Sequence, residues 1–296
     1  MATGTWKMEN KKLKIIFFGT PKEVVPVLET LIKYFDVVAV VTVPDQKAGR
    51  KQLLTPSPVK VAAQKYKIPV IQPEKLSHIT SHFSLPASDL FVVAAYGKLI
   101  PNEILQLPKL GAINIHPSLL PNYRGPTPIQ TTLFNGDQTS GVTFIKMDEE
   151  MDHGPILHQM PITLEETDTF DWLMKNMFAQ AAEILPHVIE EYVSGKIKPQ
   201  PQDNEKATYT KIITKQDGYI DLENPPSKDK FDRMVHAYFP WPTVWTKINI
   251  KNQEVRIKFL PKNMLQVEGK NLVNVNDFLN GYPEMKEIIR KIYATT

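Results

Sequence analysis

The stretch Asn114-Ile115-His116-Pro117-Ser118-Leu119-Leu120-Pro121-Asn122-Tyr123-Arg124-Gly125 decides the fold, because a strand end runs there into a proline-bounded loop. Residues 111–116 predict a short strand, since apolar isoleucines alternate with Asn114 and His116. A period of two puts these polar side chains on one face. The two prolines that follow end the strand and stiffen the loop. Open α/β sheets bind ligands at the carboxyl ends of their strands, so we expect a site here.

Strands and helices alternate in the sequence before this stretch. The apolar run Lys14–Gly19 ends in a turn glycine and indicates a buried strand. Further strands are predicted at 37–43, 68–71 and 90–95, and helices at 22–34 and 58–66. This alternation predicts a Rossmann-like α/β domain with a mostly parallel sheet and helices on both faces. Gly19-Thr20-Pro21 is not a GxGxxG fingerprint, so an NAD site is disfavoured.

The rest of the chain predicts a second, β-rich domain. Residues 167–194 have helical spacing, with a kink or break expected at Pro186. The Pro-, Gln- and Asp-rich segment 196–206 is the candidate linker. Short strands beyond it (219–222, 243–250, 254–259 and 265–267) and a helix at 231–237 suggest a small, OB-like β-barrel. The expected domains are therefore 1–195, with 1–12 disordered, and 207–296.

Composition narrows the classes of protein to consider. The chain has 296 residues and no cysteine, which excludes disulfides, thiolate metal sites and cysteine nucleophiles. No apolar run approaches the ~20 residues that span a bilayer, and the polar N-terminus lacks a signal region, so we expect no membrane association and a cytoplasmic protein. Residues 207–296 hold 14 Lys+Arg and 10 Asp+Glu within a chain of net charge +3. This bias allows a polyanionic partner, although a solvated lysine-rich surface is the more common reason for such a bias.

The central motif resembles that of the 10-formyltetrahydrofolate-dependent formyltransferases. The resemblance rests on Asn-Ile-His-Pro-Ser-Leu-Leu-Pro, on Arg124-Gly125 and on Asp152, and extends from about Lys14 to about Tyr282. Pro128-Ile129-Gln130 is similar to the branch that formylates methionyl-tRNA. Two later segments resemble the barrel-like C-terminal domain of that branch, which is shorter here: Phe239-Pro240-Trp241-Pro242 and Asp277-Phe278-Leu279-Asn280-Gly281.

The resemblance implies roles for particular residues. Asn114, His116 and Asp152 match the catalytic trio. Formyl transfer to an amine is an acyl transfer, in which amide and imidazole donors stabilise the oxyanion and a carboxylate orients the imidazole. The cofactor 10-formyltetrahydrofolate would contact Ser118, Leu119, Leu120, Pro121, Tyr96, Gly97 and Asp148. No metal is implied. From pattern alone, a lone His or Asp at such positions is more often structural.

The resemblance also implies RNA contacts. In methionyl-tRNA formyltransferases the loop matching residues 44–51 enters the acceptor end of the tRNA, so Lys47, Arg50 and Lys51 are the candidate contacts. A mobile surface loop is the alternative. Lys247 and Lys258 lie in strand-like segments and would bind phosphate if they share an outward face. Trp241 and Trp245 are expected in the core.

The leading hypothesis is transfer of formyl from 10-formyltetrahydrofolate to methionyl-initiator-tRNA by a monomeric enzyme. A sugar-nucleotide N-formyltransferase with the same Asn/His/Asp site is the alternative enzyme. A Ser-His-Asp hydrolase using Ser118 is disfavoured, because the GxSxG elbow is missing. A folate- or RNA-binding module without catalysis is disfavoured by the intact trio.

Overall fold

The computed structural model describes residues 12–49, 52–76, 85–250 and 253–293. Contacts divide the chain into two compact units that interleave along the sequence. The first comprises Met1–Arg124, Gly141–Pro161 and Lys175–Thr208, and the second Gly125–Ser140, Ile162–Met174 and Tyr209–Thr296. The sequence-based division at 196–206 stays a prediction, as does disorder at 1–12, of which 1–11 lie outside the described residues.

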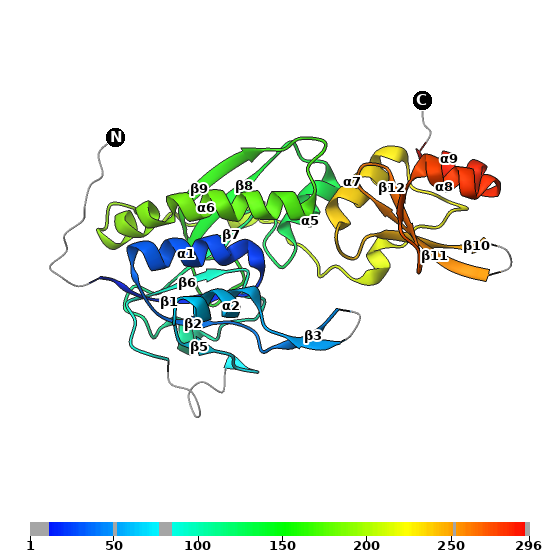
Figure 1. Ribbon diagram of the computed structural model, residues 1–296. Coiled ribbons are helices and arrows are strands. Elements are labelled where there is room, and N and C mark those ends of the chain that lie inside the picture. Colours follow the sequence, from blue (N-terminus) through cyan, green and yellow to red (C-terminus); the bar gives the residue numbers. More distant parts are fainter. Residues whose placement is uncertain (1–11, 50–51, 77–84, 251–252, 294–296) are drawn as a thin grey trace. The chain divides into compact units, whose positions relative to one another are not determined.

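A seven-stranded sheet with the order β5-β2-β1-β6-β7-β8-β9 forms the centre of the first unit (Figure 1). Its strands are β1 (Lys14–Gly19), β2 (Asp36–Val41), β5 (Val70–Ile71), β6 (Leu90–Ala94), β7 (Ala112–His116), β8 (Thr139–Lys146) and β9 (Ile156–Thr163). Parallel pairs join β5, β2, β1, β6 and β7, whereas β8 runs antiparallel to β7. The mostly parallel α/β sheet is thereby confirmed. A separate hairpin joins β3 (Gln46–Ala48) to β4 (Leu53–Thr55).

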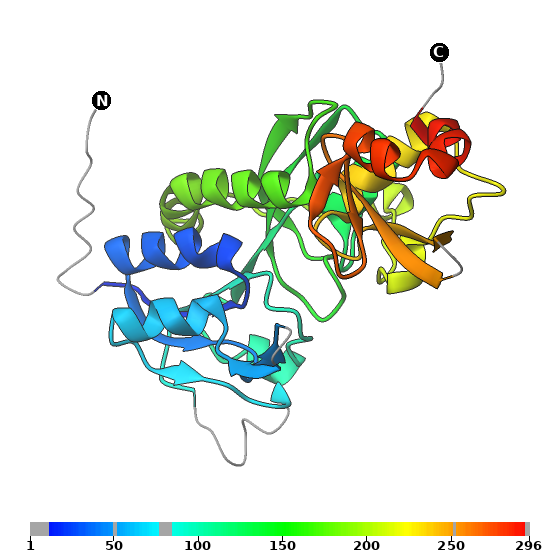
Figure 2. The same ribbon diagram turned by 45° about the vertical axis from the view of Figure 1, so that its right-hand side comes forward.

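Helices bury the apolar residues of this sheet. They are η1 (Lys22–Val24), α1 (Val25–Tyr34), α2 (Pro58–Lys65), α4 (Asn102–Leu105) and α6 (Phe170–Val193). In Figures 1 and 2, α1 and α6 lie side by side. Of the kink or break expected at Pro186, the break is wrong, because α6 is continuous there, and the kink stays a prediction. Proline removes one helical hydrogen bond, but buried Leu185, Val188 and Ile189 anchor the helix around it.

The core contains the aliphatic and aromatic residues that the strand pattern predicts. Ile16 and Phe18 of β1 pack with Phe91 and Val93 of β6 in one buried cluster. Tyr96 belongs to the same cluster, and its ring lies edge-on to that of Phe18, with centroids 5.5 Å apart. The segment immediately after β6 is therefore fixed by core packing.

The second unit contains a four-stranded antiparallel sheet with the order β10-β11-β12-β13. The strands are β10 (Val244–Ile250), β11 (Gln253–Leu260), β12 (Met264–Val267) and β13 (Leu272–Asn274). Its helices are α5 (Pro128–Asn135), η4 (Lys215–Gly218), α7 (Lys228–Tyr238), α8 (Val275–Gly281), η5 (Pro283–Met285) and α9 (Lys286–Tyr293). The short helix η3 (Asn204–Lys206) belongs to the first unit.

The OB-like barrel is not confirmed. Over the described part of the chain, each strand pairs only with its neighbours in the order, so β10 and β13 are the edges of an open sheet. The predicted strand 219–222 forms only a single bridge, between Tyr219 and Trp245. A barrel needs its edges paired to one another.

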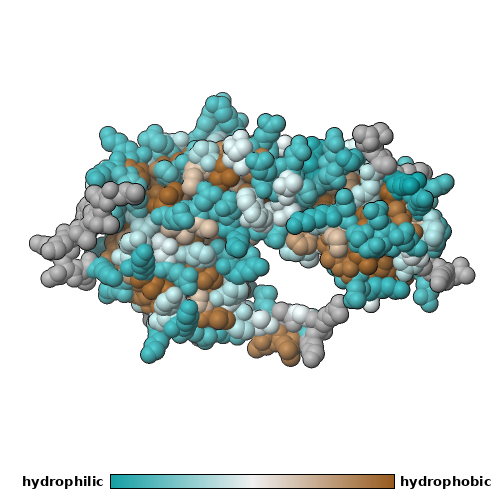
Figure 3. Space-filling view, turned by 45° about the horizontal axis from the view of Figure 1, so that its top comes forward, coloured by the Kyte–Doolittle hydropathy of each residue, from teal (hydrophilic) through white to brown (hydrophobic). Residues whose placement is uncertain are grey.

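The two tryptophans of this unit differ in exposure. Trp245 is 8% exposed, as expected of a core residue, whereas Trp241 is 57% exposed and its expected core position is wrong. The face drawn in Figure 3 is mainly hydrophilic, with apolar patches between polar residues. Over the described residues, no helix is long and apolar enough to cross a membrane.

Candidate active site

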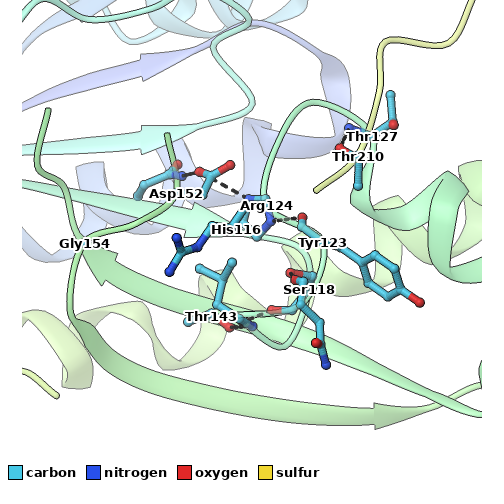
Figure 4. A network of polar contacts seen from close by, with 12 residues as sticks. His116, Ser118, Tyr123, Arg124, Thr127, Thr143, Asp152, Gly154 and Thr210 are labelled. Atoms are coloured by element: carbon cyan, nitrogen blue, oxygen red, sulfur yellow. Dashed lines mark hydrogen bonds and ion pairs between the residues drawn. The ribbon is translucent and has the colours of Figure 1, made fainter. Parts of the chain in front are cut away.

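The predicted catalytic trio comes together at the carboxyl end of β7. Asn114 and His116 project from the strand where the sheet changes from parallel pairing with β6 to antiparallel pairing with β8. Asp152 follows β8 in the loop that leads to β9. His116 is only 4% exposed, and the Asp152 side chain is 13% exposed. The imidazole and the carboxylate therefore meet in a largely desolvated place, and Figure 4 shows His116 and Asp152 pointing toward one another.

One carboxylate oxygen is the meeting point of the trio. Asn114 Nδ2 donates to Asp152 Oδ1 at 3.2 Å, and His116 Nδ1 lies 3.5 Å from the same oxygen. The other ring nitrogen, Nε2, lies 3.0 Å from the Tyr123 carbonyl oxygen. A carbonyl only accepts, so Nε2 carries the proton in this contact, and in a neutral ring Nδ1 keeps its lone pair.

The backbone of the Asp152 loop is unusual and is held from outside. Asp152 has a φ of +52°, in the left-handed region that costs a non-glycine residue about 1–2 kcal/mol. Gln202 Nε2 donates to the carbonyl oxygens of Asp152 and Gly154, at 2.8 Å each. A Cβ on Gly154 would overlap the Lys146 carbonyl oxygen, so only glycine fits this close approach.

The loop 118–121, predicted to contact folate, is anchored from within the protein. Thr143 Oγ1 donates to the Ser118 carbonyl at 2.6 Å and accepts from the Leu120 N–H at 3.1 Å. Gln159 Nε2 donates to the Leu120 carbonyl at 2.8 Å, and Ser118 Oγ to the Asn122 carbonyl at 2.7 Å. These hydrogen bonds within the protein fix the conformation of the loop, so the loop can form a rigid wall of a ligand site.

The remaining residues predicted to contact folate lie in two further segments. The Tyr96 side chain is 2% exposed in the core, and burial raises the pKa of its phenol to about 12. Gly97 has a φ of +83°, and no described atom lies within 4 Å of where its Cβ would be. Asp148 Oδ2 accepts from His153 Nδ1 at 2.7 Å. Open backbone at Gly97 and a rigid wall fit a flat ligand such as a pterin.

The predicted RNA contacts lie on two surfaces. Lys47 is exposed in β3, opposite Leu54 of β4, while Arg50 and Lys51 lie outside the described residues. In the second unit, the register pairs Lys247 with Arg256 and Trp245 with Lys258, so these four share one face. Lys247 Nζ also lies 2.6 Å from Glu254 Oε1.

Sequence reasoning missed the residues that hold the site together. Thr143 and Gln159 come from strands for which no boundaries were predicted, and Gln202 lies in the expected linker. Their contacts span 16 to 78 residues of sequence, so no local pattern reveals them. No group of three or more metal-ligating side chains occurs within 12–49, 52–76, 85–250 and 253–293.

Comparisons with known proteins find related sequences over most of the chain. Residues 12–189 match the formyl transferase family. A methionyl-tRNA formyltransferase from Chloroflexus aurantiacus is 43% identical over 237 residues, which is 79% of this chain and 76% of the relative.

Solved structures share the fold at lower identity. A 4-N formyltransferase from Francisella tularensis superposes with a TM-score of 0.64 at 19% identity, over 84% of this chain and 98% of that one. HypX from Aquifex aeolicus, in complex with tetrahydrofolic acid, superposes with a TM-score of 0.61 at 16% identity, over 84% of this chain and 38% of that one. The match over residues 12–189 and the 43% identity show that the chain belongs to the formyl transferase family and, within it, to the methionyl-tRNA formyltransferases.

Proposed function

We propose that this chain transfers the formyl group of 10-formyltetrahydrofolate to the α-amino group of methionyl-initiator-tRNA. The observation that carries the proposal is the convergence of Asn114 and His116 on one oxygen of Asp152. In a methionyl-tRNA formyltransferase, an amide donor, an imidazole and a carboxylate in this arrangement have the properties that formyl transfer requires.

The two donors of the Asn114 amide have separate tasks. An amide NH2 carries two N–H groups, and one of them already binds Asp152 Oδ1. The second donates to the formyl oxygen as that oxygen gains negative charge. Because the first bond fixes the rotamer, the donor is in place before the reaction starts.

The proton of the attacking amine passes to His116. Nε2 is committed to the Tyr123 carbonyl, so Nδ1 is the basic nitrogen of the neutral ring. Nδ1 accepts the proton while the amine nitrogen bonds to the formyl carbon. The resulting imidazolium lies 3.5 Å from the Asp152 carboxylate, which stabilises its charge. When the bond between the formyl carbon and the folate N10 breaks, the imidazolium returns the proton to that nitrogen, so tetrahydrofolate leaves and His116 is neutral again.

Folate and RNA are bound by the residues proposed from the sequence. When bound, 10-formyltetrahydrofolate supplies the formyl carbon, between the wall of Ser118, Leu119, Leu120 and Pro121 and the segments of Tyr96, Gly97 and Asp148. Because the Tyr96 side chain is in the core, its contact with folate is through the backbone. The tRNA contacts are Lys47, Arg50, Lys51, Lys247 and Lys258. The enzyme acts as a cytoplasmic monomer.

Formylation assays test this proposal. Purified protein is given 10-formyltetrahydrofolate with methionyl-initiator-tRNA, methionyl-elongator-tRNA or a 4-amino-sugar nucleotide. We expect methionyl-initiator-tRNA to be the preferred acceptor. Replacing Asn114, His116 or Asp152 by Ala should lower kcat by about 10²–10⁴-fold while the fold is retained. Transfer to the sugar alone would reject the tRNA assignment, and full activity of the Ala variants would reject the roles of the trio.

A further inference from the structure

Arg124 is a buried cation whose role the catalytic trio does not explain. Arg124 is 1% exposed, although a guanidinium is always charged and is costly to bury without partners. Its Nε and Nη2 donate to Gln202 Oε1 at 3.1 and 2.8 Å, and Nη2 also donates to Asn204 Oδ1 at 2.7 Å. Two side-chain amides are thus attached to one rigid fork.

The guanidinium determines which way both amides point. It has donors only, so the oxygen of each amide must face it, and each NH2 group must face away. Gln202 Nε2 accordingly donates to the carbonyl oxygens of Asp152 and Gly154. This is the segment in which Asp152 holds its left-handed backbone.

The second amide is linked to the other end of the same loop through His153. Asn204 Nδ2 lies 3.1 Å from His153 Nε2, which therefore accepts, and His153 Nδ1–H donates to Asp148 Oδ2 at 2.7 Å. The donor and acceptor of each hydrogen bond in this series follow from those of the bond before it, starting at Arg124. Arg124 is therefore linked to both ends of the loop from Asp148 to Gly154, to one end through Gln202 and to the other through Asn204 and His153.

We propose that Arg124, acting through Gln202 and Asn204, is a positioning residue that orients the Asp152 loop for catalysis. This inference rests on the proposed function, which makes Asp152 catalytic. The three side chains need not touch substrate. They select one backbone conformation for a carboxylate whose displacement by about 1 Å would cost about 10²-fold in rate.

Gln202→Glu tests the proposal with little change of shape. One carboxylate oxygen keeps the contact with Arg124, but the other faces the carbonyl oxygens of Asp152 and Gly154 and repels them. We expect kcat for formyl transfer to fall about 10²-fold, with KM for methionyl-tRNA within twofold. Hydrogen exchange of the amides in 149–154 should accelerate. The matched control is Gln200→Glu, because Gln200 is exposed and its amide binds the Lys198 carbonyl instead.

Asn204→Asp adds a pH readout that a merely structural role would not change. The new carboxylate keeps the hydrogen bond with Arg124, but its other oxygen faces the lone pair of neutral His153 and is repelled. Protonation of His153 restores an attractive contact. The variant should therefore lose activity at high pH and regain part of it on acidification, relative to wild type. Unaltered exchange in Gln202→Glu, or altered exchange with wild-type kcat, would overturn the inference. If wild-type protein formylates only another amine, the same kcat comparison is made with that acceptor, so the two proposals fail separately.

Discussion

The side chain of Tyr96 has an environment that its expected contact with folate did not suggest. Its ring is buried against Phe18, and its hydroxyl has no hydrogen-bond partner over the described residues. Burial raises the pKa of the phenol from 10.0 to about 12. Below pH 10 the phenol is neutral in both states and its ionisation does not affect stability. As the pH rises from 10 to about 12, the phenol ionises more readily in the unfolded state, so stability falls.

Tyr96→Phe should therefore leave stability at pH 7 unchanged or raised, because an unpartnered buried hydroxyl contributes little. Above pH 10, the variant should gain up to roughly 2–3 kcal/mol over wild type. Urea unfolding at pH 7 and at several alkaline values measures both effects. Tyr192→Phe is the control, because Tyr192 donates to the Leu110 carbonyl at 2.8 Å and its loss should cost about 1 kcal/mol. A similar loss at pH 7 in Tyr96→Phe would contradict this account.

Single residues also show what a sequence can and cannot specify. Asn114 and His116 were placed on one face by alternation alone, and the structure has them sharing the Asp152 carboxylate. Gln202 gave no signal, because its importance comes from contacts with Arg124 and the Asp152 loop, 78 and 50 residues away. Periodicity reports which way a residue faces, but not which distant backbone it meets.

Among the elements, the short helix η4 begins with hydrogen bonds whose stabilising effect depends on pH. The Asp217 carboxylate accepts from the Thr214 N–H, the Thr214 hydroxyl and Lys211 Nζ, each at 2.7 Å. The Lys211 bond is the largest cause that lowers the pKa of Asp217 to about 2, from 3.8. The stabilisation is present above pH 3.8 and lost as the pH falls through about 2.

Asp217→Asn should lower the melting temperature at pH 7, and its difference from wild type should vanish between about pH 4 and 2. Thermal unfolding followed by circular dichroism across this range measures the difference. In a Lys211→Met background the acid-dependent change should shrink, because the strongest partner of Asp217 is gone. A gap between Asp217→Asn and wild type that persists to pH 2 would show that the carboxylate charge does not stabilise this turn.

Helices and strands could be predicted where a short-range sequence pattern determines them. The strands of the parallel sheet follow from apolar runs, whereas β8 and β9 were not delimited and β13 was missed. Leu272–Asn274 is three residues long with one half-buried position, too short to show a period. The barrel was expected from short strands, but closure depends on pairing between edges, which short-range patterns do not encode.

At the scale of the whole molecule, charge is the property through which we propose that the second unit binds a polyanionic substrate. Its face with Lys247, Arg256 and Lys258 also carries Trp245, over which Arg256 lies 5.0 Å from the ring centroid. Because Trp245 is 8% exposed, its ring is not open to a base, but the cations of this face suit phosphates. Glu254, 2.6 Å from Lys247, offsets part of this charge, so Lys258 should contribute more than Lys247.

Replacing both Lys247 and Lys258 by Gln should weaken binding of methionyl-tRNA and reduce the slope of log K against log salt by about 1–2, since each phosphate contact contributes roughly 0.7–0.9. Filter binding across a salt series measures the slope. The matched control removes two exposed lysines from helices of the first unit, Lys33 in α1 and Lys65 in α2. It loses the same net charge, so a purely global effect would lower both slopes equally. An unchanged slope in the Lys247 and Lys258 variant would exclude this face from the tRNA site, while a selective decrease would assign phosphate binding to it.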